Sequence, residues 1–146
     1  MRDGVELARK YHLPERIIDF IREHHGTMYT HYQYTQAVNL AGDSANVDRA
    51  LFTYPGPRPQ SKETALLMLA DGTEARARAE VPKTEEELRI LVDLVVGFYQ
   101  KNKQLDDTNL TLRDLQEVKN SFCRSLNGTY HPRMKYPEFD NQNDHD

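Results

Sequence analysis

The spacing of apolar residues along the chain predicts an all-α fold. In residues 84–103, apolar side chains recur every three or four positions, as they do on the buried face of an amphipathic helix. Residues 111–126 repeat this pattern, and residues 62–78 begin with an almost continuous apolar run that indicates a mostly buried helix. The residues expected on the buried stripes are Leu88, Leu91, Leu94, Val95 and Phe98 in the first segment and Leu112, Leu115, Val118, Phe122 and Leu126 in the second.

The N-terminal part of the chain predicts three shorter helices. Residues 3–11 begin with acidic residues at capping-box spacing. Residues 13–25 follow helical spacing, with Pro14 suited to the first turn and Gly26 to the C-terminal cap. Residues 28–38 are rich in tyrosine and threonine but lack the alternation of a strand, so we expect a helix there as well.

Capping residues indicate where the longer helices begin. Thr84 and Glu87 have the spacing of a capping box. Ser61 is suited to the N-cap position that precedes residues 62–78. Gly72 lowers the stability of that helix by about 1 kcal/mol relative to alanine, so a break at this glycine is also compatible with the sequence.

A long irregular segment, residues 42–60, contains three closely spaced prolines that make residues 55–59 stiff and extended. Arg58 and Lys62 lie on either side of Ser61. Two cations near a helix N-terminus could together bind a phosphate group. An ordinary pair of solvated charges explains the same residues equally well, so the residues alone leave both interpretations open.

The composition is that of one soluble globular domain, since 38% of the 146 residues are hydrophobic and 29% are charged. A formal net charge of −4 argues against a nucleic-acid-binding surface, which would be basic. The single cysteine, Cys123, excludes an internal disulfide and fits a small core residue. Because no apolar run approaches the roughly 18 residues of a membrane-spanning helix, we expect a cytoplasmic chain without membrane contact of its own.

Two adjacent histidines are the first candidates for chemistry. His24 and His25 lie on the last turn expected for residues 13–25, where unsatisfied carbonyl groups favour a nearby cation. Neutral imidazole is also the commonest protein ligand for transition metals. Adjacent helical residues point about 100° apart, so the two rings could ligate two metals or one cluster. The alternative is that both histidines are exposed, charge-compatible helix caps.

Asp71 is the acidic residue that most requires an explanation. It follows the apolar run of residues 65–70, and burial of a carboxylate is costly unless the group is paired or bound to a metal. Glu74 and Arg78 continue the same helix face. This face could simply be solvated, with Glu74 and Arg78 as an ion pair, which is the commoner outcome for such spacing.

Several segments in combination resemble a known family. They are Glu-His-His-Gly-Thr at 23–27, Tyr-Pro-Gly-Pro-Arg-Pro-Gln-Ser-Lys-Glu at 54–63, Met-Leu-Ala-Asp at 68–71 and Gly-Thr-Tyr-His at 128–131. In this order they resemble the cytosolic HD domain of the seven-transmembrane, PgpH-type phosphodiesterases. The resemblance implies hydrolysis of cyclic di-AMP by the complete domain.

The resemblance also implies an all-helical HD-type domain with two metal ions, iron or manganese, held by histidine and aspartate. Carried over by position, His24 and His25 match the histidine pair of the family, and Asp71 matches its last aspartate ligand. Two metals of this kind can activate a water and neutralise the charge of a phosphodiester. The candidates for contacting the cyclic dinucleotide substrate are Arg58, Lys62, Glu74 and Arg78.

The chain departs from the family pattern at its beginning. The family's earlier histidine and its His-Asp doublet lie upstream of the matched segment, and no His-Asp dipeptide precedes residues 145–146 here. We therefore expect residues 1–137 to be the C-terminal part of an HD domain that lacks its N-terminal helices, and residues 138–146 to be a disordered acidic tail. Three matched ligands are too few for two metals, so we expect the isolated chain to bind metal poorly and to have little activity.

Other properties remain open at this point. The uncovered apolar surface of such a partial domain would favour a homo-oligomer. A noncatalytic helical module that binds a nucleotide or a partner protein is one alternative function. An HD phosphohydrolase that acts on another nucleotide is the second.

Overall fold

The computed structural model describes residues 2–130. In this range it contains six α-helices, two short 3₁₀ helices and one isolated bridge between Tyr29 and Thr53. The expected all-α class is confirmed, whereas the predicted tail at residues 138–146 lies outside the described residues. The helices are α1 (Arg2–Lys10), α2 (Glu15–Glu23), α3 (His31–Ala41), η1 (Ser44–Asn46), η2 (Arg49–Phe52), α4 (Lys62–Glu80), α5 (Glu85–Lys101) and α6 (Leu112–Tyr130).

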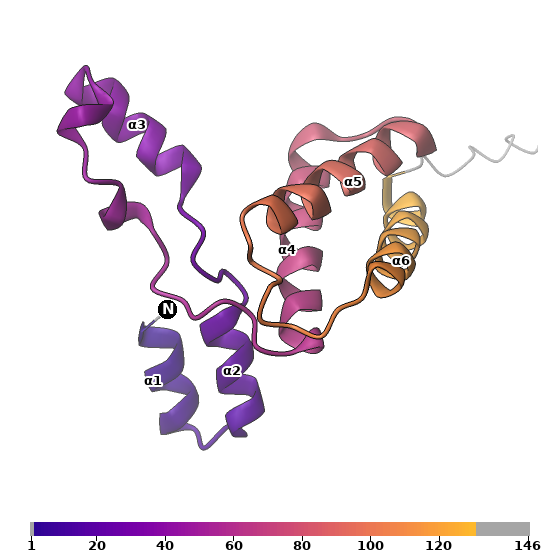
Figure 1. Ribbon diagram of the computed structural model, residues 1–146, viewed down its shortest axis with the longest axis horizontal. Helices are drawn as coiled ribbons and strands as arrows, with labels where there is room; N and C mark the ends of the chain where they lie inside the picture. Colours follow the sequence, from indigo (N-terminus) through magenta and orange to yellow (C-terminus); the bar gives the residue numbers. More distant parts are fainter. Residues whose placement is uncertain (1, 131–146) are drawn as a thin grey trace, which may run out of the picture.

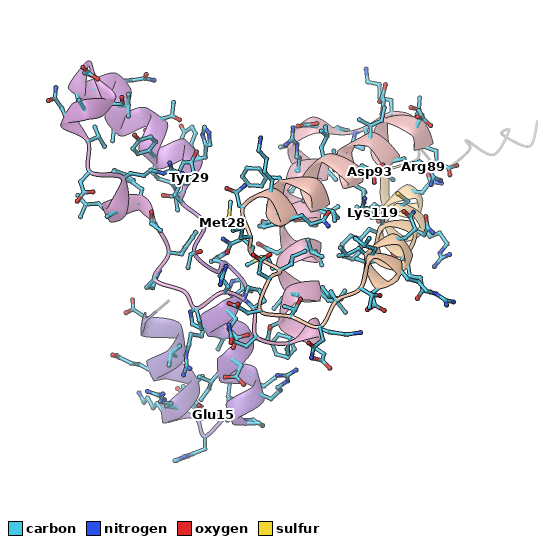
Figure 2. All side chains as sticks on the ribbon, viewed as in Figure 1. Glu15, Met28, Tyr29, Arg89, Asp93 and Lys119 are labelled. Atoms are coloured by element: carbon cyan, nitrogen blue, oxygen red, sulfur yellow. The ribbon has the colours of Figure 1, made fainter. Side chains whose placement is uncertain are left out.

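Helices α4, α5 and α6 pack together as the main body of the chain (Figure 1). Helix α1 lies against α2, and α2 in turn contacts α4. On the outside of the body, Asp93 of α5 and Lys119 of α6 form an ion pair of 2.9 Å (Figure 2). The main core consists of Ala65, Leu69, Leu88, Val92, Val96, Leu105, Leu115 and Cys123. Cys123 is therefore the core residue that the sequence predicts.

The buried face of α5 differs from the predicted stripe. Leu94 and Phe98 are 55% and 46% exposed, whereas Val92 and Val96 are buried. The reason is that α5 contacts both α4 and α6, so its core face follows two adjacent rows of residues and turns Leu94 and Phe98 away. Leu112, at the first position of α6, is likewise 81% exposed instead of buried. The interior residues of α5 are Leu88, Leu91, Val92, Val95 and Val96.

The predicted N-caps of the long helices are confirmed. The Ser61 side chain accepts a hydrogen bond from the Thr64 N–H, and the Thr64 side chain completes the capping box. Thr84 accepts from the Glu87 N–H, but the Glu87 carboxylate accepts from the Lys83 N–H and not from the N-cap residue. These bonds satisfy the first N–H groups of α4 and α5, which have no partner within their own helix.

The first two helices are each displaced by a residue or two from their predicted limits. Helix α1 begins at Arg2, so Asp3 lies inside the first turn instead of at the N-cap. Helix α2 ends at Glu23, and His24 is its C-cap residue. The histidine pair therefore lies just after the last turn of α2, and Gly26 follows with a φ of +52°.

Helix α3 and the two 3₁₀ helices form an arm, residues 31–52, that extends away from the body (Figure 1). Helix α3 begins three residues after the predicted start, because residues 28–30 pair with residues 52–54. The bonds run from the Thr30 N–H to the Phe52 carbonyl and from the Tyr54 N–H to the Met28 carbonyl, both at 2.8 Å. No residue of α3 is buried, and its helix contacts are with η1 and η2.

Within residues 2–130, no helix combines the length and apolar character that crossing a membrane requires.

Candidate site at the histidine turn

The turn after α2 holds the two histidines in a defined orientation. The His24 N–H donates to the Phe20 carbonyl, which continues the helical bonding by one residue. The His24 Nδ1 lies 2.7 Å from the same carbonyl oxygen. Because a carbonyl can only accept, Nδ1 carries the proton in this contact, and the lone pair of the neutral ring is on Nε2. This bond fixes both the tautomer and the direction of the ring, as is usual for histidines that bind metals.

Glu23 anchors the turn from one side. Its side chain is only 5% exposed, and its Oε2 accepts hydrogen bonds from the Gln60 N–H at 2.9 Å and the Thr64 hydroxyl at 2.7 Å. Gln60 directly follows residues 55–59, which we call the proline segment, and Thr64 belongs to the first turn of α4. One buried carboxylate therefore joins the end of α2, the proline segment and the start of α4.

Gln104 anchors the turn from the other side. Its side chain is 3% exposed and bonds to Thr27, accepting from the N–H at 3.0 Å and donating to the hydroxyl at 2.9 Å. Gly26 is enclosed by the same groups, since a Cβ at this position would lie 2.7 Å from the Met68 side chain and collide with Gln104. A side chain is thus excluded both by the positive φ and by the packing.

The two imidazole rings lie close together and continue into an aromatic stack. The ring centroids of His24 and His25 are 4.0 Å apart, and the His25 ring stacks on Tyr54 at 4.3 Å with an interplanar angle of 24°. Burial lowers the pKa of His25 below its ordinary value of 6.5, and His24 acts in the same direction, whereas Asp71 opposes the shift. His25 is therefore biased toward the neutral form that can bind a metal.

Asp71 lies near His25 but is exposed, which corrects the expectation of a costly buried carboxylate. The apolar residues before Asp71 are distributed around α4, and only some of them are buried. Position 71 lies on the solvent-exposed side of the helix. Next to it, Gly72 does not break the helix. A Cβ on Gly72 would lie 2.7 Å from the Tyr99 ring, so the glycine makes room for this tyrosine.

Tyr99 and Tyr54 complete the surroundings of the histidine turn. Burial raises the pKa of Tyr99 above its ordinary value of 10.0, and Asp71 and Tyr54 raise it further. These two tyrosines, together with Glu23 and Gln104, are residues that the sequence did not single out for this site. Gly72 was the available signal, because a glycine inside a helix often marks a close packing contact.

The candidate ligands fit a metal in their chemistry but do not form a complete site. Imidazole nitrogen and carboxylate oxygen suit iron or manganese. In residues 2–130, however, no three histidine, cysteine, aspartate or glutamate side chains converge closely enough to hold a metal ion. His24, His25 and Asp71 are therefore neighbours that do not surround a common point by themselves.

The candidate cations Arg58 and Lys62 are both engaged by carboxylates. Arg58 donates to both carboxylate oxygens of Asp107 at 3.0 Å and to the Lys103 carbonyl at 2.9 Å. Lys62 pairs with Asp114 at 2.7 Å, and this hydrogen bond, with further bonds from Thr111, lowers the pKa of Asp114 to about 2. The two side chains reach toward the α5–α6 connection and the start of α6, and they do not form a shared phosphate clamp around Ser61.

Glu74 and Arg78 form an exposed ion pair of 3.4 Å on α4, which is the solvated arrangement left open from their spacing. A role of any of the four charged residues in contacting a substrate stays a prediction.

The all-helical fold of the described residues is consistent with an HD-type helical domain. The chain is homologous to the HD domain of the cyclic-di-AMP phosphodiesterase PgpH. It is 33% identical over 136 residues to the PgpH of Bacillus subtilis (strain 168) and 30% identical over 137 residues to that of Listeria monocytogenes serotype 1/2a (strain 10403S). No family model matches the chain.

Solved structures of the L. monocytogenes PgpH HD domain have the same fold. The structure in complex with cyclic-di-AMP superposes with a TM-score of 0.82 at 30% identity and covers 92% of this chain and 62% of that one. A second structure of the domain gives a TM-score of 0.78 at 29% identity, with 89% and 59% covered. The chain spans about a fifth of the length of the two curated PgpH relatives, since it covers 19% of each.

Proposed function

We propose that this chain is the C-terminal part of an HD domain that hydrolyses cyclic di-AMP, and that His24, His25 and Asp71 contribute ligands to its metal centre. The observation that carries the proposal is homology over 92% of the chain to an HD domain crystallised with cyclic-di-AMP. The histidine turn, with Asp71 near it, lies inside this homologous region.

The local chemistry of the turn supports the assignment of the two histidines. The His24 Nδ1–H is held by the Phe20 carbonyl, so Nε2 is the nitrogen available for a ligand. Burial lowers the pKa of His25, which favours the neutral ring that can bind a metal. Asp71 is exposed near this ring and adds a carboxylate, a ligand type that suits iron or manganese.

We further propose that the metal centre needs residues beyond those of this chain. Three ligands are too few to fill two coordination spheres. The chain also spans only 62% of the solved HD domain, which leaves room for additional ligands in a complete domain. The isolated chain should therefore bind Mn²⁺ weakly and hydrolyse little cyclic di-AMP.

The decisive experiment is a chimera in which this chain replaces its homologous segment in the L. monocytogenes PgpH HD domain. We expect the chimera to hydrolyse cyclic di-AMP in the presence of Mn²⁺. The variants His24→Ala, His25→Ala and Asp71→Ala should lose at least about 100-fold in rate, because each removes a metal ligand. Glu117→Ala, which removes an exposed carboxylate of α6 that is no candidate for the site, is the matched control and should retain most of the activity.

The outcomes separate the remaining functions. A folded chimera that binds cyclic di-AMP without hydrolysing it would favour a noncatalytic binding module. Faster turnover of another nucleotide would change the substrate but keep the metal chemistry. Hydrolysis that is unaffected by Asp71→Ala would contradict the ligand assignment, as would equal Mn²⁺ content in all variants by elemental analysis.

A further inference from the structure

Helix α5 carries an exposed apolar row on the side away from the core. Ile90, Leu94 and Phe98 are 51%, 55% and 46% exposed. They are spaced four residues apart, so they form a continuous stripe along one side of the helix. Among the described helices, α5 packs only on α4 and α6, through its opposite side. A row of large apolar side chains exposed in this way is typical of an interaction surface.

Charged residues extend this row symmetrically about Leu94. Glu87 lies seven residues before Leu94 and Lys101 lies seven residues after it, which places both on the same side of the helix after two turns. Ile90 and Phe98 lie four residues before and after Leu94. We call this set of five residues, Glu87, Ile90, Leu94, Phe98 and Lys101, the α5 face.

The symmetry makes the α5 face complementary to a second copy of itself. If two copies pair antiparallel about a two-fold axis at Leu94, Glu87 of each chain lies opposite Lys101 of the other. In the same arrangement, Ile90 lies opposite Phe98. Both charge pairs are then attractive, whereas a parallel arrangement would bring like charges together. A two-fold axis requires a self-complementary patch of this kind.

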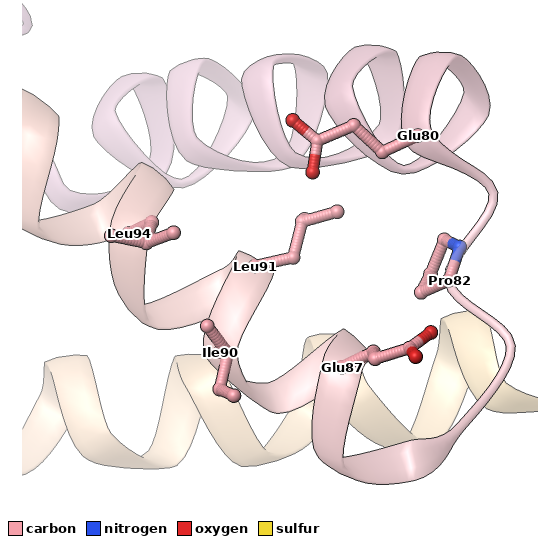
Figure 3. Close-up of a pocket in the computed structure, with 6 residues that line it drawn as sticks. All are labelled: Glu80, Pro82, Glu87, Ile90, Leu91 and Leu94. Carbon is pink, nitrogen blue, oxygen red and sulfur yellow. The ribbon is translucent and has the colours of Figure 1, made fainter.

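The shape of the surface matches the same arrangement. A groove of about 260 Å³ opens at the Ile90 end of the α5 face, between α5 and the end of α4 (Figure 3). It is lined by Glu80, Pro82, Glu87, Ile90, Leu91 and Leu94. The Phe98 ring of the second copy lies opposite this end and can enter the groove. Gly97 beside Phe98 has open space where a Cβ would be, so it allows the second helix to approach closely.

We propose that the α5 face pairs antiparallel with the α5 face of a second copy of this chain. The charge complementarity selects a second copy over an unrelated partner, because the acidic and basic ends match only when the face meets itself. A single helix pair buries less than the roughly 1,200–2,000 Å² of a standard stable interface. The dimer should therefore be weak and should dissociate on dilution.

Sedimentation velocity of the full 146-residue chain over a range of concentrations tests the proposal. We expect a reversible monomer–dimer equilibrium, and a shift of at least about tenfold toward the monomer in Leu94→Glu, which places two like charges at the axis. Gln100→Glu adds the same charge outside the α5 face and is the matched control. A wild-type chain that stays monomeric, or a dimer that Leu94→Glu leaves unchanged, would overturn the proposal.

A charge swap distinguishes the antiparallel arrangement from other dimers. Glu87→Lys and Lys101→Glu should each weaken the dimer, and the double variant should restore it. Glu87 and Lys101 are separated by about four turns of one helix, so they cannot rescue each other within a chain. Glu86→Lys controls for the added positive charge. Thermal unfolding of each variant is measured in parallel, because Glu87 also accepts the Lys83 N–H.

Covalent capture gives an independent readout that does not depend on affinity. In Leu94→Cys, the two introduced thiols meet at the axis and should form an intermolecular disulfide under mild oxidation. Gln100→Cys should cross-link much less under the same conditions, and the native Cys123 is buried. Equal cross-linking of both variants would overturn the placement of the axis.

Discussion

The histidine turn and the arm are held in place in different ways. The turn is held by two buried polar side chains, Glu23 and Gln104, which connect it to the proline segment, α4 and the α5–α6 connection. The arm contains no buried residue in α3 and is joined to the rest of the chain by a short paired stem. The histidine turn is thus fixed by hydrogen bonds to distant parts of the chain, whereas the arm has mainly local ones.

The two regions each contain a glycine with a positive φ, and these glycines give the sharpest comparison. Gly26→Ala should destabilise the chain by about 3 kcal/mol, because the new Cβ adds left-handed strain and collides with Gln104 and Met68. Gly42→Ala in the arm should cost only about 1 kcal/mol of strain, since nothing lies within 4 Å of its Cβ. Urea unfolding measures both. Equal losses of unfolding free energy in the two variants would show that packing around Gly26 does not add to the cost of backbone strain.

Removal of the buried carboxylate tests the anchoring of the turn directly. Glu23→Ala should lower the free energy of unfolding by about 2 kcal/mol, because the Gln60 N–H and the Thr64 hydroxyl lose a charged acceptor. Glu23→Gln keeps an acceptor oxygen and should cost less. The same urea titration applies, with chemical shifts of the His24 and His25 rings as the readout for the turn. An unchanged stability in Glu23→Ala would contradict the anchoring role.

The two helical glycines should respond to alanine with opposite signs. Alanine normally stabilises a helix interior by about 1 kcal/mol relative to glycine. Gly97→Ala should show this gain at concentrations where the chain is monomeric, because its Cβ would meet no neighbour. Gly72→Ala should instead lose about 1 kcal/mol, because the new Cβ presses on the Tyr99 ring. Thermal unfolding measures both, and a stabilising Gly72→Ala would refute the close contact with Tyr99.

The smallest expected effect concerns the exposed pair at the start of α6. Lys62→Ala should raise the pKa of Asp114 from about 2 toward its ordinary value of 3.8. The rise should be only partial, because the hydrogen bonds from Thr111 remain. Because the folded-state pKa is lowered, ionised Asp114 stabilises the fold above about pH 3.8 and loses this contribution as the pH falls through about 2. Carboxyl NMR titration measures the pKa. Lys83→Ala, an exposed control, should leave it unchanged.

Several elements could be predicted because their determinants are local. Ser61, Thr84 and the periodic apolar residues of α4, α5 and α6 act within a few residues of themselves, so the helices followed from the sequence. The same local information failed where the outcome depends on a distant segment. Residues 28–30 join a bridge instead of α3 because they pair with residues 52–54, and a helical pattern cannot reveal such a partner.

The candidate site also has one part that could be predicted from the sequence and another that depends on distant segments. His24, His25 and Asp71 could be named from their types and from the resemblance to a family. Their surroundings depend on how α2, α4 and α5 pack together. This packing leaves Asp71 exposed, stacks Tyr54 on His25 and places Tyr99 against Gly72. Arg58 and Lys62 are close in sequence, but their side chains do not meet. Each pairs with a different carboxylate far along the chain, Asp107 and Asp114 respectively.

The sequence by itself determined the helical class, the caps and the choice of candidate metal ligands, because these depend on side-chain type and on spacing of three or four residues. Only the tertiary structure decided which side of α5 is buried and which groups hold the histidine turn in place. The physical reason is that an amphipathic pattern specifies that a helix has an apolar side, but the neighbours in space determine which apolar residues are covered. Leu94 and Phe98 are apolar and exposed because α4 and α6 pack on the other side of the helix.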